Sequence, residues 1–253
     1  MSNELVVAKF GSDIVVSDTF DTQTQLNMYA ENLMSRHKPN NLIIISSGAV
    51  ALGSRFIEGM GKNSESFSLQ EKAQLGAAAI SQAWQHAFQL QGEAAGGLLV
   101  THNELNDAQE GAMLLRLLGR NRKEGVVPVI NENDALSVTE LMELATGGDN
   151  DGLARHIATK VGADGIEFYT KRGGIYDDNS NQIHVVTSEN SQELTVMLQA
   201  RAAEKVGGRG RGDMLSKHTN ALKFSRSTGW VKISQPPVGQ PNPETETFYP
   251  RAK

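Results

Sequence analysis

The sequence contains no cysteine among its 253 residues. This absence excludes disulfide bonds, thiolate metal sites and a thiol nucleophile. The chain also lacks any apolar run approaching the ~20 residues that span a bilayer, and its first residues do not have the basic and then apolar character of a signal peptide. We therefore expect a cytoplasmic protein with no membrane partner.

An excess of positive charge is also absent. The net charge of -5 argues against a nucleic-acid partner. The histidines show no zinc-type spacing, so we expect no protein-built metal site; they are His37, His86, His102, His156, His184 and His218. An apolar content of 39% and a charged content of 21% are ordinary for a globular protein, and the length suits one large α/β domain.

Short apolar runs alternate with helical patterns through the first half of the chain. The runs that predict strands are residues 5–10, 42–46, 98–101 and 126–130, the last ending at Asn131. Helical spacing follows at residues 21–36 and 108–123, and Ser68 with Glu71 forms a capping box for a third helix. Successive strand–helix pairs imply parallel pairing through right-handed crossovers. The predicted fold is a three-layer αβα sandwich with a mainly parallel central sheet.

The second half continues this pattern with shorter elements. It predicts a strand at 165–170, a short strand pair at 175–176 and 183–186, helices at 191–205 and from Met214, and a last core strand at 230–233. The proline-rich tail from Gln235 is predicted to be irregular and to lie on the surface.

Two clusters of carboxylates and carboxamides lie close together in the middle of the chain. Residues 131–134 follow a predicted buried strand, and residues 147–151 precede a predicted helix. Open α/β sheets bind their ligands at the carboxyl ends of the strands. Ordinary turns use the same residue types. Together, however, the two clusters suit a site for a polar zwitterion beside phosphates or a hydrated magnesium ion.

Lys9 stands near the end of the first predicted strand, directly before a glycine turn. A strand interior would have to desolvate its ammonium group, so we expect the head group to emerge at the ligand crevice. A surface lysine on an edge strand is the alternative. After the second strand, Ser47 and the N–H groups of Gly48 and Ala49 form a helix start suited to an anion, although a tight strand-to-helix turn needs the same small residues.

Residues 207–213 combine glycines and arginines directly before a helix. Flexible glycines, cations and a helix amino terminus together make a phosphate cradle. The segment matches neither the GxxxxGK[ST] loop nor the GxGxxG fingerprint, and the latter mismatch disfavours a dinucleotide-binding oxidoreductase.

Taken together, these segments resemble the amino acid kinase family and, within it, the glutamate 5-kinases. The likeness runs from about residue 5 to residue 225. The segments that carry it are KFGS at 9–12, SSGAVALG at 46–53, VPVINEND at 127–134, GDND at 148–151 and GRGDMLSK at 210–217. The resemblance implies one amino acid kinase domain over residues 1–253, with an acceptor-binding half at about 1–160 and a nucleotide-binding half at about 161–253. We expect no PUA domain of the kind found in many bacterial members.

The resemblance implies transfer of the ATP γ-phosphoryl group to the side-chain carboxylate of L-glutamate, which gives glutamyl 5-phosphate, the first step of proline biosynthesis. ATP and Mg²⁺ are the implied cofactors, and a homo-oligomer with feedback by proline is implied as well. Phosphoryl transfer needs positioning and cationic stabilisation. Because glutamate supplies its own nucleophile, no general base is required.

The same resemblance assigns roles to individual residues. Lys9 and Lys217 would neutralise the transferring phosphoryl group, with Asp151 holding both. The implied glutamate-binding residues are Ser47, Gly48, Ala49, Asp134, Asp149 and Asn150. The implied nucleotide-binding residues are Lys9, Gly11, Ser12, Thr170, Lys171, Arg211, Gly212, Met214 and Lys217. None is assigned to a metal.

Three positions depart from the family pattern. Lys171 stands where the family usually has an aspartate, and Arg211 and Asp213 replace small residues in a loop usually read GTGGM. Asp213 could repel the phosphates that Arg211 attracts. Two alternatives therefore stand beside a glutamate kinase. One is a sibling kinase with another acceptor, and the other is a catalytically impaired, glutamate-binding regulatory protein.

Overall fold

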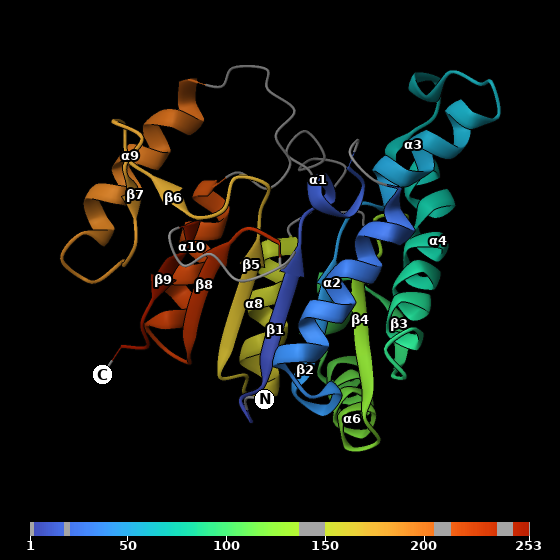
Figure 1. Ribbon diagram of the computed structural model, residues 1–253, viewed down its shortest axis with the longest axis horizontal. Helices are drawn as coiled ribbons and strands as arrows, with labels where there is room; N and C mark the ends of the chain where they lie inside the picture. The colour runs from blue at the N-terminus through green and yellow to red at the C-terminus, as the bar shows by residue number, and fades with distance from the viewer. Residues whose placement is uncertain (1–2, 18–20, 137–149, 205–213, 237–244, 253) are drawn as a thin grey trace.

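A seven-stranded sheet forms the middle layer of the protein (Figure 1). The structure is a computed structural model that describes residues 3–17, 21–136, 150–204, 214–236 and 245–252. The strand order is β3-β4-β2-β1-β5-β8-β9. All neighbouring strands pair in parallel except β8 and β9, which pair in antiparallel fashion. The carboxyl ends of the parallel strands therefore meet at one edge of the sheet.

The strands are β1 (Val6–Phe10), β2 (Leu42–Ser46), β3 (Ala94–Val100), β4 (Val126–Glu132), β5 (Gly165–Tyr169), β8 (Trp230–Ser234) and β9 (Thr247–Tyr249). A separate antiparallel hairpin joins β6 (Ile175–Tyr176) to β7 (Gln182–Ile183). The helices are α1 (Ser12–Val15), α2 (Thr22–Arg36), α3 (Ala49–Gly59), α4 (Leu69–Gln89), α5 (His102–Asn106), α6 (Ala108–Lys123), α8 (Asn150–Val161), α9 (Ser191–Glu204) and α10 (Met214–Ser225), with short 3-10 turns at Pro39–Asn41 and Ser64–Ser66.

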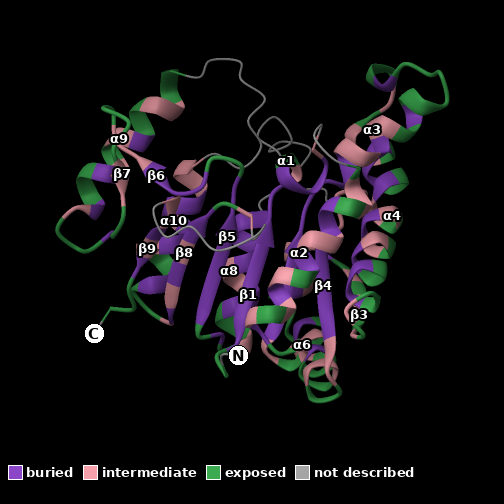
Figure 2. Ribbon diagram, in the orientation of Figure 1, coloured by how far each residue is buried: buried purple, intermediate pink, exposed green. Residues whose placement is uncertain are grey.

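Alternate residues of the central strands face two separate apolar cores. Ala8 and Phe10 of β1 pack with α2 and α4 on one face, whereas Val7 packs with α8 and α10 on the other. Figure 2 shows the central strands buried along their length. This confirms the predicted three-layer sandwich. None of the helices in the described ranges combines the length and apolar character needed to cross a membrane.

Several sequence-based predictions about element boundaries are wrong. β3 begins at Ala94 and not at residue 98, and β7 ends at Ile183 and not at residue 186. β4 does not end at Asn131, because Asn131 and Glu132 continue its pairing with β3 and both are buried. The tail from Gln235 is not wholly irregular, since β9 adds to β8 and Tyr249 is fully buried. Buried polar residues and a short strand after several prolines have weak sequence signals, and tertiary packing decides both.

The crossing of α3 and α4 depends on two glycines. A Cβ atom at Gly76 of α4 would lie 1.9 Å from the carbonyl oxygen of Ala49, and one at Gly53 of α3 would lie 1.9 Å from that of Lys72. The two backbones therefore touch, which only glycine permits. Because α3 begins at Ala49, this contact fixes the turn that precedes it.

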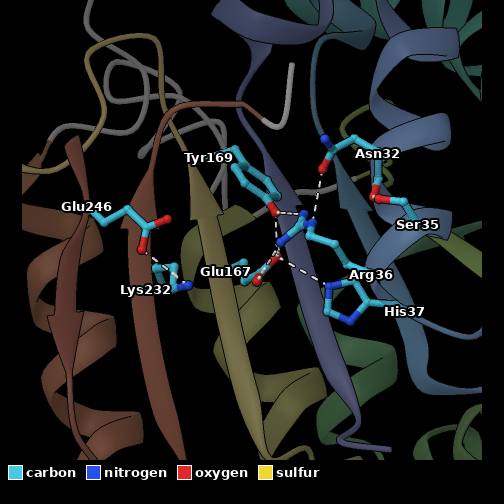
Figure 3. A network of polar contacts seen from close by, with 8 residues as sticks. All are labelled: Asn32, Ser35, Arg36, His37, Glu167, Tyr169, Lys232 and Glu246. Carbon is cyan, nitrogen blue, oxygen red and sulfur yellow. Dashed lines mark hydrogen bonds and ion pairs between the residues drawn. The ribbon is translucent and has the colours of Figure 1, made fainter. Parts of the chain in front are cut away.

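A buried polar network joins the end of α2 to the middle of β5 (Figure 3). Arg36 donates hydrogen bonds to Glu167 (3.2 Å) and to the Tyr169 hydroxyl (2.7 Å), which in turn donates to Glu167. Burial would raise the pKa of Glu167, but His37 and Arg36 outweigh it and lower the pKa to about 2. This charged network therefore fixes the position of β5 relative to α2, directly before Thr170.

Replacing Gly76 with Ala should lower the free energy of unfolding by more than about 2 kcal/mol, because two backbones must separate to admit the methyl group. Gly119, an exposed residue of α6 with nothing within 4 Å of an added Cβ, is the matched control. Its replacement with Ala should stabilise the protein by roughly 0.5–1 kcal/mol. Urea unfolding measures both changes, and equal effects of the two substitutions would contradict this account of the crossing.

Candidate active site

Two lysines from distant parts of the chain share one carboxylate. Lys9 Nζ lies 2.7 Å from Oδ1 of Asp151, and Lys217 Nζ lies 3.1 Å from Oδ2 of the same residue. Lys9 comes from β1, Asp151 from the first turn of α8 and Lys217 from the first turn of α10. β1 is a central strand, which excludes the alternative of an edge-strand lysine for Lys9.

The electrostatics of this triad are unbalanced. All three side chains are almost fully buried. Burial lowers the pKa of Lys9, and the charge of Lys217 adds to this, while Asp151 opposes both. Burial would raise the pKa of Asp151, but Lys217 and Lys9 outweigh it and lower the pKa to about 2. Two ammonium groups thus contact one carboxylate, with Asp13 as a weaker attraction for Lys9, and such a pair of buried cations suits the binding of an anion.

The turn after β1 lies directly beside the triad. Gly11 and Ser12 follow Lys9 by two and three positions, and the Gly11 carbonyl accepts hydrogen bonds from Ile14 and Val15. A Cβ atom at Gly11 would lie 2.7 Å from Oδ1 of Asp13. Glycine at this position thus leaves room for the Asp13 carboxylate over the backbone at the carboxyl end of β1.

A second turn leaves the neighbouring strand β2 at the same edge. Ser46 pairs in register with Phe10, and its hydroxyl accepts a 2.9 Å hydrogen bond from the Trp84 ring nitrogen. Ser47, Gly48 and Ala49 follow and are all buried. Gly48 has φ +105, a left-handed conformation that favours glycine, so the turn can enter α3 without strain. The N–H groups at the start of α3 thus lie near the end of β1.

The end of β4 brings amide groups to this edge. Asn131 pairs in register with Ser46 and is buried, yet neither of its amide atoms has a hydrogen-bond partner in the described part of the chain. Asn150, at the start of α8, is also buried, and its Oδ1 has no such partner within the described ranges. Leaving buried polar atoms unsatisfied costs about 1–3 kcal/mol each, which a polar ligand would offset.

Asn131 belongs to a polar cluster in the sequence, but the sequence alone assigns it no binding role. Its only sequence signal is an amide directly after a β-branched run, a position that the sequence equally assigns to a turn. Asp134 follows it, half-buried, in the turn after β4. Asp149 lies outside the described residues.

The carboxyl end of β5 carries the residues predicted for the nucleotide. The Thr170 hydroxyl donates to the Gly173 carbonyl (2.7 Å) and accepts from the Gly173 N–H (2.9 Å), so it stabilises the turn. Lys171 is exposed, and Met214 is half-buried at the start of α10. Arg211, Gly212 and the neighbouring Asp213 lie outside the described residues, so this loop stays a prediction.

No group of three or more His, Asp or Glu side chains within the described ranges is arranged to hold a metal ion. Magnesium commonly binds through one or two carboxylates together with substrate phosphates and water. The donor set found here is therefore compatible with an ion that is held mainly by nucleotide phosphates.

Comparison with known proteins decides the family. The model of the amino acid kinase family matches residues 4–233, which is most of the chain. The chain belongs to the amino acid kinase family. A glutamate 5-kinase of Pseudomonas paraeruginosa is 32% identical over 230 residues, covering 90% of this chain and 61% of that protein. A glutamate 5-kinase of Shouchella clausii is 35% identical over 184 residues, covering 72% of this chain and 48% of that one. The chain thus spans about half to three fifths of the length of these curated relatives.

Solved structures agree with the fold. A carbamate kinase structure from Giardia superposes with a TM-score of 0.61 at 11% identity and covers 100% of both chains. A Giardia lamblia carbamate kinase bound to AMP-PNP gives a TM-score of 0.58 at 14% identity. At these identities the likeness shows that this family member has the three-layer fold of the carbamate kinases.

Replacing Asp151 with Asn keeps the shape of the side chain but removes the negative charge that both ammonium groups contact. We expect the free energy of unfolding at neutral pH to fall by about 3–5 kcal/mol, the usual cost of removing one partner of a buried ion pair. The deficit should shrink as the pH is raised to about 9. Asp151 opposes the lowering of the Lys9 pKa, so its loss lowers that pKa further than in the parent protein, and the folded variant releases the proton at a lower pH and gains more stability as the pH rises.

Urea unfolding at neutral and alkaline pH measures both effects. Asp178→Asn is the control, because Asp178 is exposed and its pair with Arg201 should contribute less than about 1 kcal/mol. A deficit of Asp151→Asn that stays constant with pH would contradict the proposed electrostatics of the triad.

Proposed function

We propose that the protein transfers the γ-phosphoryl group of ATP to the side-chain carboxylate of L-glutamate, giving glutamyl 5-phosphate and ADP. The observation that carries this proposal is the pair of lysines, Lys9 and Lys217, on the single carboxylate of Asp151. Such a cationic pair at the carboxyl edge of a parallel sheet suits a transferring phosphoryl group, whose charge is spread over three oxygens.

The acceptor would lie on the β2 and β4 side of the triad. There the start of α3 offers backbone N–H groups from Gly48 and Ala49 to a carboxylate. Asn131 offers a buried amide, and Asn150 a buried Oδ1, without a hydrogen-bond partner in the described ranges. Asp134 would bind the ammonium group. We assign residues of about 1–160 to this acceptor half, and the relatives named glutamate 5-kinase support glutamate as the acceptor.

The nucleotide would lie on the β5 side, in the half formed by residues of about 161–253. Gly11 and Ser12 would let the backbone approach the phosphates, while the turn from Thr170 would border the nucleoside. Magnesium, held by the phosphates, would supply charge neutralisation between the β- and γ-phosphates.

The transfer needs no proton removal from the acceptor. A carboxylate oxygen of glutamate attacks the γ-phosphorus, the bond from the γ-phosphorus to the bridging oxygen breaks, and its electron pair leaves with ADP. Lys9 and Lys217 would hold the charge on the phosphoryl oxygens, and Asp151 would hold the two ammonium groups in place. Positioned charges of this kind stabilise a transition state without reorganising.

The direct test is turnover in a coupled ADP-release assay with ATP, magnesium and a panel of acceptors. The expected result is turnover with L-glutamate and little with aspartate, carbamate or acetate. Turnover with carbamate alone would instead assign a sibling activity. A rise in melting temperature with glutamate but not with ATP, and no turnover, would indicate a glutamate-binding protein without kinase activity.

Replacing Lys217 with Ala should lower kcat by about 100- to 1,000-fold, because one charge on the phosphoryl group is lost. The affinity for glutamate should change little, since Lys217 lies on the nucleotide side. Lys223→Ala, on an exposed position of the same helix, is the matched control and should keep kcat. Steady-state kinetics and glutamate calorimetry measure the two effects, and an equal loss in both would refute the assigned role.

A further inference from the structure

The residue directly after Lys217 has no part in the proposed chemistry, yet it is fully buried and fully hydrogen-bonded. His218 Nε2 lies 2.8 Å from the Thr195 hydroxyl of α9, and its Nδ1 lies 2.8 Å from the Tyr249 hydroxyl of β9. The imidazole therefore joins three elements, since it belongs to α10 itself. None of these contacts reaches the triad directly.

The hydrogen-bond network assigns the tautomer of His218. Thr195 donates its only hydroxyl proton to the Ser191 carbonyl at 2.7 Å, so its oxygen accepts from Nε2–H of His218. Nδ1 then accepts the proton of the Tyr249 hydroxyl, which is buried. The opposite tautomer would leave that hydroxyl proton without an acceptor among the residues that the structure describes. All protons run in one direction, from Tyr249 through His218 and Thr195 to Ser191.

Neutral imidazole is the form that this arrangement needs. Burial lowers the pKa of His218 to about 4, so the ring carries no charge near neutral pH. A like charge near Arg226 is thereby avoided, and both ring nitrogens keep their partners.

The helix geometry connects this ring to the triad. Successive side chains of an α-helix project about 100° apart, so His218 faces α9 and β9 while Lys217 faces α8. A rotation of α10 by about 10° would move a group some 6 Å from its axis by about 1 Å. Such a rotation would lengthen the hydrogen bonds of His218 and the ion pair of Lys217 at the same time. Displacements of about 1 Å can cost a factor of about 100 in rate.

A second contact holds the same helix along its other side. Arg155 of α8 donates a 2.8 Å hydrogen bond to Asn220, one turn after Lys217. The polar contacts of α10 with α8, through Lys217 and Asn220, therefore lie on one side. Phe224 packs in the apolar core, and His218 adds directional hydrogen bonds on the side that faces α9 and β9.

We propose that His218 is a positioning residue for Lys217, acting through the rotation of α10 that its bonds to Thr195 and Tyr249 set. The proposal rests on the proposed phosphoryl transfer for its kinetic consequence. Its structural part, the placement of the Lys217 amine, can be measured without turnover.

The experiment compares His218→Leu, Tyr249→Phe and a matched control in the full chain. Leu removes both hydrogen bonds of the ring, and Phe removes one hydroxyl while keeping the aromatic volume. Phe224→Leu is the control, because Phe224 is a buried residue of the same helix that belongs to the apolar core and not to the network. Steady-state kinetics, melting temperatures and the acylation rate of each lysine by an N-hydroxysuccinimide ester are measured for all variants.

His218→Leu should lower kcat by about 10- to 100-fold and leave KM for glutamate within about twofold. Tyr249→Phe should lower kcat by a smaller factor. The Lys217 amine, protected by its ion pair in the parent protein, should become acylated faster in both variants. Phe224→Leu should lower the melting temperature but keep kcat and Lys217 protection.

Retaining the donor at the Nε2 position with His218→Gln, or the acceptor at the Nδ1 position with His218→Asn, should restore part of the lost kcat. If His218→Leu does not fold, Tyr249→Phe decides the question by the same measurements. An unchanged kcat and unchanged Lys217 acylation, or an equal loss in Phe224→Leu, would overturn the positioning role. Absence of turnover in the parent protein would instead refute the proposed function, and the acylation rates would still decide the role of His218.

Discussion

The structure depends above all on one carboxylate that two lysines share. Asp151 can bind Lys9 and Lys217 together only when β1, α8 and α10 are all in place. The contact therefore forms only in the correctly folded chain. The same contact places two ammonium groups against one carboxylate in a buried setting. Assembly of the fold and the proposed affinity for a phosphoryl group therefore involve the same buried charges.

Two different kinds of interaction support this triad on its two sides. On the β2 side, backbone contact between α3 and α4 at Gly53 and Gly76 fixes the turn at Gly48. On the β9 side, directional hydrogen bonds of His218 fix α10. The close backbone packing of α3 against α4 resists movement of the turn at Gly48, whereas the directional hydrogen bonds of His218 resist rotation of α10.

The fold was largely predictable from the sequence, because β-branched runs, helical spacing and capping residues all favour the same layers. The motifs around Lys9, Asp151 and Lys217 each indicated a binding site. That the three side chains lie together followed only from the family resemblance and not from the motifs themselves. Individual long-range partners could not be predicted. The pairing of His218 with Tyr249 joins a helix to a tail that composition assigns to the surface, and such contacts leave no periodic signal.

Strand β9 has a practical consequence for anyone who cuts this chain into fragments. The family match stops at residue 233, before β9 begins. A fragment that ends at that point would expose the unpaired backbone N–H and C=O groups of β8. Other copies of the fragment can pair with such an edge strand and aggregate. It would also deprive His218 of its tyrosine. The minimal folding unit of this kinase-family chain therefore extends beyond the boundary that homology alone would draw.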